Sequence, residues 1–265
     1  MENNMTDNAF DLTGKVALIT GGNGGIGLGM ATALARAGAN IAIWGTNPDK
    51  NAAAKDTLAA IGIETEAYVC NVTDRDAVNQ TMAAVLEKFG RLDAVFANAG
   101  VTGRGSKSFL DITPEDWRRV IGINLDGTFH TYQAAVRHMM ERAEKGDPGG
   151  RLIAISSLAS VSGPPRNEHY AASKGALNSL TFALAVEYGR HGITANAILP
   201  GWIETDMTEN LMSNEKFAAA AGSRIPTRRW GKPEDFGGMA VYLASDASSY
   251  HTGQLMQIDG GYWRF

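Results

Sequence analysis

A tyrosine and a lysine four residues apart, in the stretch Tyr170-Ala-Ala-Ser-Lys174, form a combination suited to proton transfer. If the stretch is helical, as its small residues indicate, the phenol and the ammonium lie on one face of the helix. A free tyrosine has a pKa near ~10, and a cation within a few ångströms favours the phenolate and lowers that pKa. Such a pair arises by chance with a probability of about one in four, so it needs support from other residues.

Further polar residues supply that support. Ser156 and Ser157 end the run Arg151-Leu-Ile-Ala-Ile155, which is typical of a buried strand. Ligands of open α/β sheets bind at the carboxyl ends of strands, so a hydroxyl at this position is well placed for chemistry. Asn124 lies earlier in the chain, within Ile123-Asn-Leu-Asp126.

A glycine-rich turn near the start of the chain predicts a dinucleotide site. Thr20-Gly21-x-x-x-Gly25-Ile-Gly27 lies between an apolar strand, Lys15–Thr20, and an alanine-rich helix, residues 28–37. Glycine has no side chain to keep a pyrophosphate away from the backbone, and the amino end of the helix offers N–H groups to the anion.

The alternation of strands and helices continues to the end of the chain. We expect strands at residues 40–44, 66–70, 94–97, 152–156, 194–199 and 255–258, and helices at 48–61, 74–89, 113–141 with a possible break, and 170–191. This order predicts a Rossmann-type, doubly wound α/β fold, with a mainly parallel seven-stranded sheet and helices on both faces. We expect residues 1–10 to be a flexible tail and 11–265 one domain, with a substrate lid at about 201–229.

Composition limits the partners. The 265 residues carry a net charge of -4 and show no basic stripe, which argues against binding to nucleic acid. The single cysteine, Cys70, cannot form an internal disulfide, and the five histidines show no ligand spacing, so no metal site is expected. There is neither an apolar run of 18 residues nor a signal peptide, so we expect no membrane contact and a cytoplasmic location.

Together these motifs resemble the short-chain dehydrogenase/reductase family from about Leu12 to Tyr262. The resemblance implies an NAD(P)-dependent oxidoreductase that interconverts a small secondary alcohol and a ketone by hydride transfer. It implies that Tyr170 is the acid or base and that Lys174 lowers its pKa and holds the nicotinamide ribose. It also implies that Ser157, preferred over Ser156 by the family spacing, orients the substrate oxygen, and that Asn124 anchors a water in the proton relay.

The resemblance also implies a set of cofactor-binding residues. Asn71-Val72 stands where the family usually has Asp-Val, so the contact at the adenine edge loses a charge. The full set is Gly21, Asn23, Gly25, Ile26, Gly27, Thr46, Asn71, Val72, Asn98, Ala99, Gly100, Tyr170, Lys174, Pro200, Gly201, Ile203 and Thr205.

The choice between NAD(H) and NADP(H) stays open in the sequence. The second strand ends in Trp44-Gly45-Thr46-Asn47, which has neither the acid that binds a ribose hydroxyl nor an arginine for a 2′-phosphate. Gly24, where NADP enzymes of the family often have a basic residue, is neutral. This favours NAD(H) slightly, although Lys50 could reverse the preference.

Two alternatives stay open. A 3-oxoacyl carrier-protein reductase would use the same residues, but the neutral Gly24 argues against it. A non-catalytic dinucleotide sensor would bind partners through the same fold. The resemblance further implies a homotetramer or a dimer, in which the helices of Asn124 and Tyr170 pair across one two-fold and residues 253–265 suit another contact.

Overall fold

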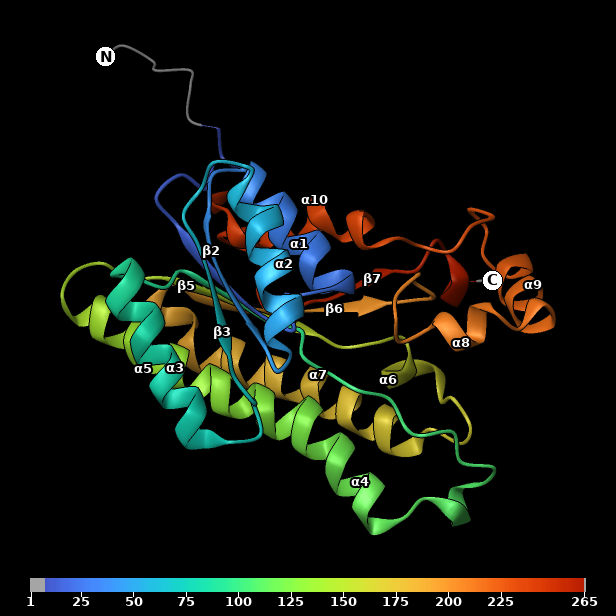
Figure 1. Ribbon diagram of the computed structural model, residues 1–265. Coiled ribbons are helices and arrows are strands. Elements are labelled where there is room, and N and C mark those ends of the chain that lie inside the picture. The colour runs from blue at the N-terminus through green and yellow to red at the C-terminus, as the bar shows by residue number, and fades with distance from the viewer. Residues whose placement is uncertain (1–7, 265) are drawn as a thin grey trace.

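The computed structural model describes residues 8–264, and its centre is a sheet of seven parallel strands (Figure 1). From edge to edge they are β3 (Thr65–Val69), β2 (Asn40–Gly45), β1 (Val16–Thr20), β4 (Ala94–Ala97), β5 (Gly150–Ile155), β6 (Ile193–Pro200) and β7 (Leu255–Ile258). The strand order reverses between β1 and β4, which is where doubly wound sheets bind their ligands. The predicted fold class is confirmed.

Helices cover both faces of this sheet (Figure 1). One face carries α1 (Gly25–Arg36), α2 (Pro48–Ala59) and α10 (Gly237–Ala244), and the other carries α3 (Arg75–Phe89), α5 (Gly127–Glu144) and α7 (Glu168–Tyr188). Each face has its own apolar core, with Met30, Leu34, Leu58 and Leu243 on the first and Val78, Val85 and Met139 on the second. Strands covered on both faces are continuous apolar runs, as the sequence shows. No helix within residues 8–264 is long and apolar enough to cross a membrane.

The long helix predicted at 113–141 is two helices joined by a π-helical turn. Thr113 caps α4 (Pro114–Ile121) by accepting a hydrogen bond from the amide of Asp116 at 3.1 Å. The chain then widens into a π-helical turn, Gly122–Asp126, before α5 begins. This turn contains Asn124, which is completely buried. Single π turns inside α-helices are frequent at functional sites, so the predicted break has a structural role.

The segment after β6 packs on an apolar cluster of its own. It contains α8 (Glu209–Met212) and α9 (Glu215–Ser223), which lie together at one end of the molecule (Figure 1). The ring of Trp202 meets Phe217 edge-on with centroids 5.1 Å apart and Tyr262 at 6.3 Å. These contacts join the segment to the carboxyl-terminal residues. Its movement as a lid stays a prediction.

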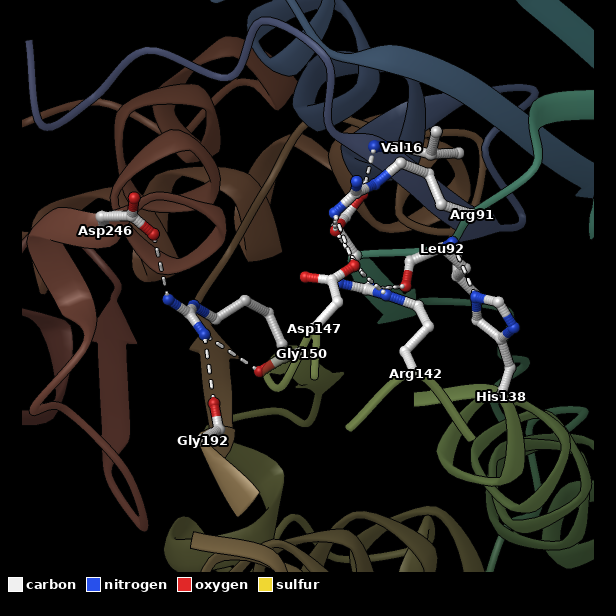
Figure 2. A network of polar contacts seen from close by, with 11 residues as sticks. Val16, Arg91, Leu92, His138, Arg142, Asp147, Gly150, Gly192 and Asp246 are labelled. Carbon is white, nitrogen blue, oxygen red and sulfur yellow. Dashed lines mark hydrogen bonds and ion pairs between the residues drawn. The ribbon is translucent and has the colours of Figure 1, made fainter. Parts of the chain in front are cut away.

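A network of charged side chains ties the amino ends of the central strands together (Figure 2). The carboxylate of Asp93, which precedes β4, accepts from the amide of Val16 at 2.9 Å and from Arg91 Nη2 at 2.7 Å. Arg142 Nη1 lies 3.1 Å from the same carboxylate. Burial alone would raise the pKa of Asp93, but the bonds from Arg91 and Val16 outweigh it and lower the pKa. This network lies at the edge opposite the carboxyl ends of the strands, away from the predicted site.

Candidate active site

The phenol of Tyr170 lies in the first turn of α7, beside the end of β5. The side chain of Ser157, two residues beyond that strand, lies near enough to the phenol to influence it. Burial raises the pKa of Tyr170, and the interaction with Ser157 opposes this only in part. The sequence-based expectation of a lowered pKa is therefore wrong for this structure, because burial disfavours the charged phenolate. At neutral pH the phenol keeps its proton.

Lys174 lies one helical turn beyond Tyr170 and on the same face, as predicted. Its Nζ is 5.6 Å from the centroid of the Tyr170 ring and donates to the carbonyl of Ile155 at 2.7 Å. The side chain is only 4% exposed, and burial lowers its pKa to about 8. The amine therefore loses its charge at a lower pH than the phenol loses its proton, which is a second reason why it does not lower the pKa of Tyr170.

The two neighbouring serines have different surroundings. Ser156 is buried and donates to the carbonyl of Lys174 at 3.0 Å, which fastens the end of β5 to α7. Ser157 is half-buried, and its Oγ accepts from the amide of Ala159 at 3.1 Å. Of the two, Ser157 is the serine that influences the phenol, and its role in orienting a substrate oxygen stays a prediction.

Asn124 uses both ends of its amide to hold the loop after β4. Its Oδ1 accepts from the amide of Val101 at 2.8 Å, and its Nδ2 donates to the carbonyl of Val101 at 3.0 Å and to Ser173 Oγ at 3.0 Å. A Cβ built on Gly100 would lie 3.3 Å from Asn124 Oδ1 and 3.4 Å from Lys174 Nζ. The structure thus brings Asn124, Gly100 and Lys174 together.

The glycine turn is shaped to admit a diphosphate. Gly21 and Gly25 have φ angles of 63° and 49°, which side chains rarely tolerate. A Cβ on Gly24 would meet nothing within 4 Å, so the backbone is open there to a ligand. Helix α1 has no acid in its first turn and no side-chain cap from residues 8–264. Its amino-terminal N–H groups can therefore bind an anion, and the turn fits a dinucleotide.

Several of the predicted cofactor residues serve to brace this turn. Asn98 Nδ2 donates to the carbonyls of Thr20 at 2.9 Å and Gly21 at 3.1 Å, and Asn23 Nδ2 donates to Asn51 Oδ1 at 2.7 Å. Thr205 lies across the crevice, with its Cγ2 3.3 Å from a Cβ built on Gly25. The structure therefore places the segment after β6 directly over the turn.

The remaining predicted cofactor residues lie at the carboxyl ends of the strands. Asn71 is exposed and accepts from Thr73 Oγ1 at 3.0 Å, so its carbonyl oxygen is engaged locally. Ile203 is 4% exposed and belongs to the core, so its side chain faces away from solvent. The others follow a strand or begin a helix: Ile26 in α1, Thr46 after β2, Val72 after β3, Ala99 after β4, and Pro200 and Gly201 at the end of β6.

Sequence reasoning did not foresee two side-chain pairs beside the site. Lys50 Nζ lies 2.7 Å from Asp206 Oδ2 and links the start of α2 to the segment after β6. His169 Nε2 lies 2.9 Å from Asp116 Oδ2 and links α7 to α4. No local pattern signals either pair, because the partners are far apart in the chain. The position of His169 next to Tyr170 was the one available hint.

The comparisons with known proteins identify the family. The chain matches the model of the family described as enoyl-(acyl carrier protein) reductase over residues 21–263, which include the glycine turn and the Tyr170–Lys174 pair. The chain belongs to the short-chain dehydrogenase/reductase family. It is therefore an NAD(P)-dependent oxidoreductase that interconverts a secondary alcohol and a ketone.

Similar proteins match this dehydrogenase/reductase over nearly their full lengths. A gluconate 5-dehydrogenase from Gluconobacter oxydans is 37% identical over 252 residues, 95% of this chain and 96% of that protein. A 3-oxoacyl-(acyl-carrier-protein) reductase from Thermotoga maritima is 38% identical over 250 residues, 94% of this chain and 98% of its own. The structure of a gluconate 5-dehydrogenase from Burkholderia cenocepacia with NADP and tartrate is 34% identical, has a TM-score of 0.91 and covers 97% of this chain and 98% of that one. A nicotinamide dinucleotide is supported, but a preference for NAD is not.

Proposed function

We propose that Tyr170 is the acid and base of this oxidoreductase, with Ser157 and Lys174 beside it. During reduction the phenol gives its proton to the carbonyl oxygen of the substrate, and during oxidation the phenolate, formed when the phenol loses its proton, takes the proton of the alcohol. Ser157 donates to the same oxygen and orients it. The nicotinamide ring supplies or accepts the hydride when bound.

The placement of Tyr170 between Ser157 and Lys174 is the observation that carries this proposal. Lys174 Nζ lies 5.6 Å from the centroid of the Tyr170 ring, and Ser157 follows β5 at the carboxyl end of the sheet, beside a turn that fits a dinucleotide. The raised pKa of Tyr170 keeps the phenol protonated at neutral pH, which suits a proton donor to a ketone. Lys174, which donates to the carbonyl of Ile155, would donate further hydrogen bonds to the hydroxyls of a ribose.

We propose that the substrate is a small polyhydroxy acid such as gluconate. Relatives that act on gluconate support this class, and the Burkholderia structure holds tartrate, a hydroxy acid. Arg104 offers a cation for the carboxylate, because it follows the loop after β4 and its side chain is 78% exposed. Its contact with Asp116 is long, at 3.9 Å, and Asp116 already accepts Arg119 at 2.8 Å.

We propose that NADP(H) is the cofactor, against the slight preference drawn from the sequence. The residues at the end of β2, Gly45 to Asn47, include no carboxylate that would repel a 2′-phosphate. Lys50 lies in the first turn of α2 just beyond them, and its ammonium is 2.7 Å from the carboxylate of Asp206. If a bound 2′-phosphate took the place of the Asp206 carboxylate as the partner of Lys50, the ammonium would stay paired with an anion.

Turnover by the variant Tyr170→Phe tests the proposed acid–base role of Tyr170. We expect oxidation of gluconate, followed as NADPH absorbance, to fall at least about 10²-fold while the dissociation constant for NADP+ stays within about twofold. A non-catalytic sensor would show no turnover in the wild type, and unchanged turnover in the variant would refute the role of Tyr170. Reduction of a 3-oxoacyl thioester with no activity on gluconate would favour the carrier-protein reductase.

Two variants test the proposed cofactor and the proposed substrate class. Lys50→Gln should weaken the binding of NADP+ about tenfold in calorimetry and leave NAD+ unchanged. Arg104→Gln should raise KM for gluconate about tenfold but not KM for an uncharged ketone. Arg118→Gln is a matched control, since Arg118 is exposed on α4 and pairs with Glu115. Equal effects of Arg104→Gln on both substrates would remove Arg104 from the proposal.

A further inference from the structure

His169 is a buried ionisable residue that the proposed mechanism does not use. It lies in the first turn of α7, directly before Tyr170, and is 0% exposed. Its Nε2 is 2.9 Å from Oδ2 of Asp116, in the first turn of α4. A lone buried histidine is often only a satisfied core residue, so its surroundings decide whether this one does more.

Asp116 is held in place as a carboxylate. Its Oδ1 accepts from Arg119 Nε at 3.0 Å and Nη2 at 2.8 Å. Burial alone would raise the pKa of Asp116, but the bonds from Arg119 and His169 outweigh it and lower the pKa. A carboxylate only accepts hydrogen bonds, so Nε2 of His169 carries the proton and donates it. The orientation of the imidazole ring is therefore fixed from α4.

The same imidazole supports the loop after β4. A Cβ on Gly103 would overlap the ring of His169, so the backbone of this loop packs directly against it. The neighbouring Thr102 is held on two sides, by Arg119 Nη2 donating to its carbonyl at 2.8 Å and by Asn167 Nδ2 donating to its Oγ1 at 2.8 Å. Asn167 Oδ1 also accepts from the amide of Gly103 at 3.1 Å. Gly100, which directly precedes this loop, lies next to the amine of Lys174.

Three elements thus meet at His169: α4, the loop of residues 101–103, and the helical turn that bears Tyr170. We propose that His169 is a positioning residue, which sets the phenol of Tyr170 against the loop through its bond to Asp116. The proposal rests on the proposed acid–base role of Tyr170. Loss of the bond would let the first turn of α7 and the loop shift relative to each other, and displacements near 1 Å at a reacting group cost about 10²-fold in rate.

The test compares two substitutions at position 169. His169→Leu replaces the imidazole donor by an apolar side chain. We expect kcat to fall about 10²-fold, with the dissociation constant for NADP+ within about twofold of the wild type. His169→Gln places an amide N–H toward Asp116, and we expect it to recover kcat to within about tenfold of the wild type. Asp116→Ala removes the acceptor of this bond and should lower kcat, and adding it to His169→Leu should lower kcat by less than it does in the wild type, because the bond is already absent.

A control separates positioning from stability. His138 accepts from the amide of Leu92 at 3.2 Å at the amino ends of the strands (Figure 2), so His138→Leu should lower the melting temperature without changing kcat. The proposal fails if kcat of His169→Leu falls no further than in this control at a similar loss of stability. If His169→Leu does not fold, the kcat of Asp116→Ala decides, and a wild-type value overturns the proposal. Tyr170→Phe measured alongside would expose a failure of the acid–base assignment separately.

Discussion

Substitution of Lys174 by methionine should stabilise the folded protein at neutral pH, although it removes a residue of the proposed active site. The lysine is 4% exposed, and burial lowers its pKa from 10.5 to about 8. Below pH 8 the ammonium is charged in both states, so the folded state carries the whole cost of burying it. This cost is about 3 kcal/mol, since one pKa unit corresponds to about 1.4 kcal/mol.

The sign of the pH dependence follows from the lowered pKa. Between pH 8 and pH 10.5 the folded protein has released this proton and the unfolded chain has kept it. The unfolded state then binds more protons, and the free energy of unfolding of the wild type rises with pH. Lys174→Met lacks this term, so its advantage over the wild type should shrink by about 2 to 3 kcal/mol between pH 7 and pH 10.

Urea unfolding at one protein concentration and at several pH values between 7 and 10 measures this difference. Other titrating groups cancel, because they are present in both proteins. Lys216→Met is a suitable control, since Lys216 is exposed and its substitution should give a difference that does not change with pH. A flat difference for Lys174→Met over the same range would refute the argument that the buried ammonium is costly.

Three further outcomes are expected. Asp93→Ala should lower the free energy of unfolding by about 3 to 5 kcal/mol in urea titrations, because it leaves the largely buried Arg142 and the amide of Val16 without this carboxylate. The stabilisation by Asp93 is present above pH 3.8 and is lost as pH falls through its lowered pKa. Gly27→Ala should abolish NADP+ binding in calorimetry, because the added Cβ would overlap the carbonyl of Gly21, and wild-type affinity would show that the turn can open. Val186→Asp, at an 87% exposed valine on α7, should reduce the mass seen by light scattering if that face joins two copies, and an unchanged oligomer would exclude the face.

Exposed apolar side chains on α5 and α7 give that last expectation a structural basis. A groove of about 440 Å³ lies between these two helices, where apolar side chains such as Phe129 and Leu184 line it. Phe182 on the same helix is 44% exposed. Exposed apolar side chains on two neighbouring helices are typical of an interface, so the predicted homo-oligomer stays a proposal with a defined surface.

Local patterns were sufficient for the order of the elements and for the main motifs. A strand, a glycine turn and a helix are determined by residues adjacent in the chain, which is why the turn at Gly21 to Gly27 was predictable. The four-residue spacing of Tyr170 and Lys174 determines a shared helical face in the same way. The break before α5 was also visible, but not its form as a π turn around Asn124.

Properties that depend on burial and on distant partners were decided by the tertiary structure alone. The sequence argument predicted the wrong direction for the pKa shift of Tyr170. The four-residue spacing shows that a cation is near, but it does not show how completely burial removes water from both groups. The bond of His169 to Asp116 joins residues 53 positions apart, and that of Lys50 to Asp206 joins residues 156 apart. Sequence adjacency determines which groups share a turn, whereas desolvation and long-range pairing exist only once the chain has packed.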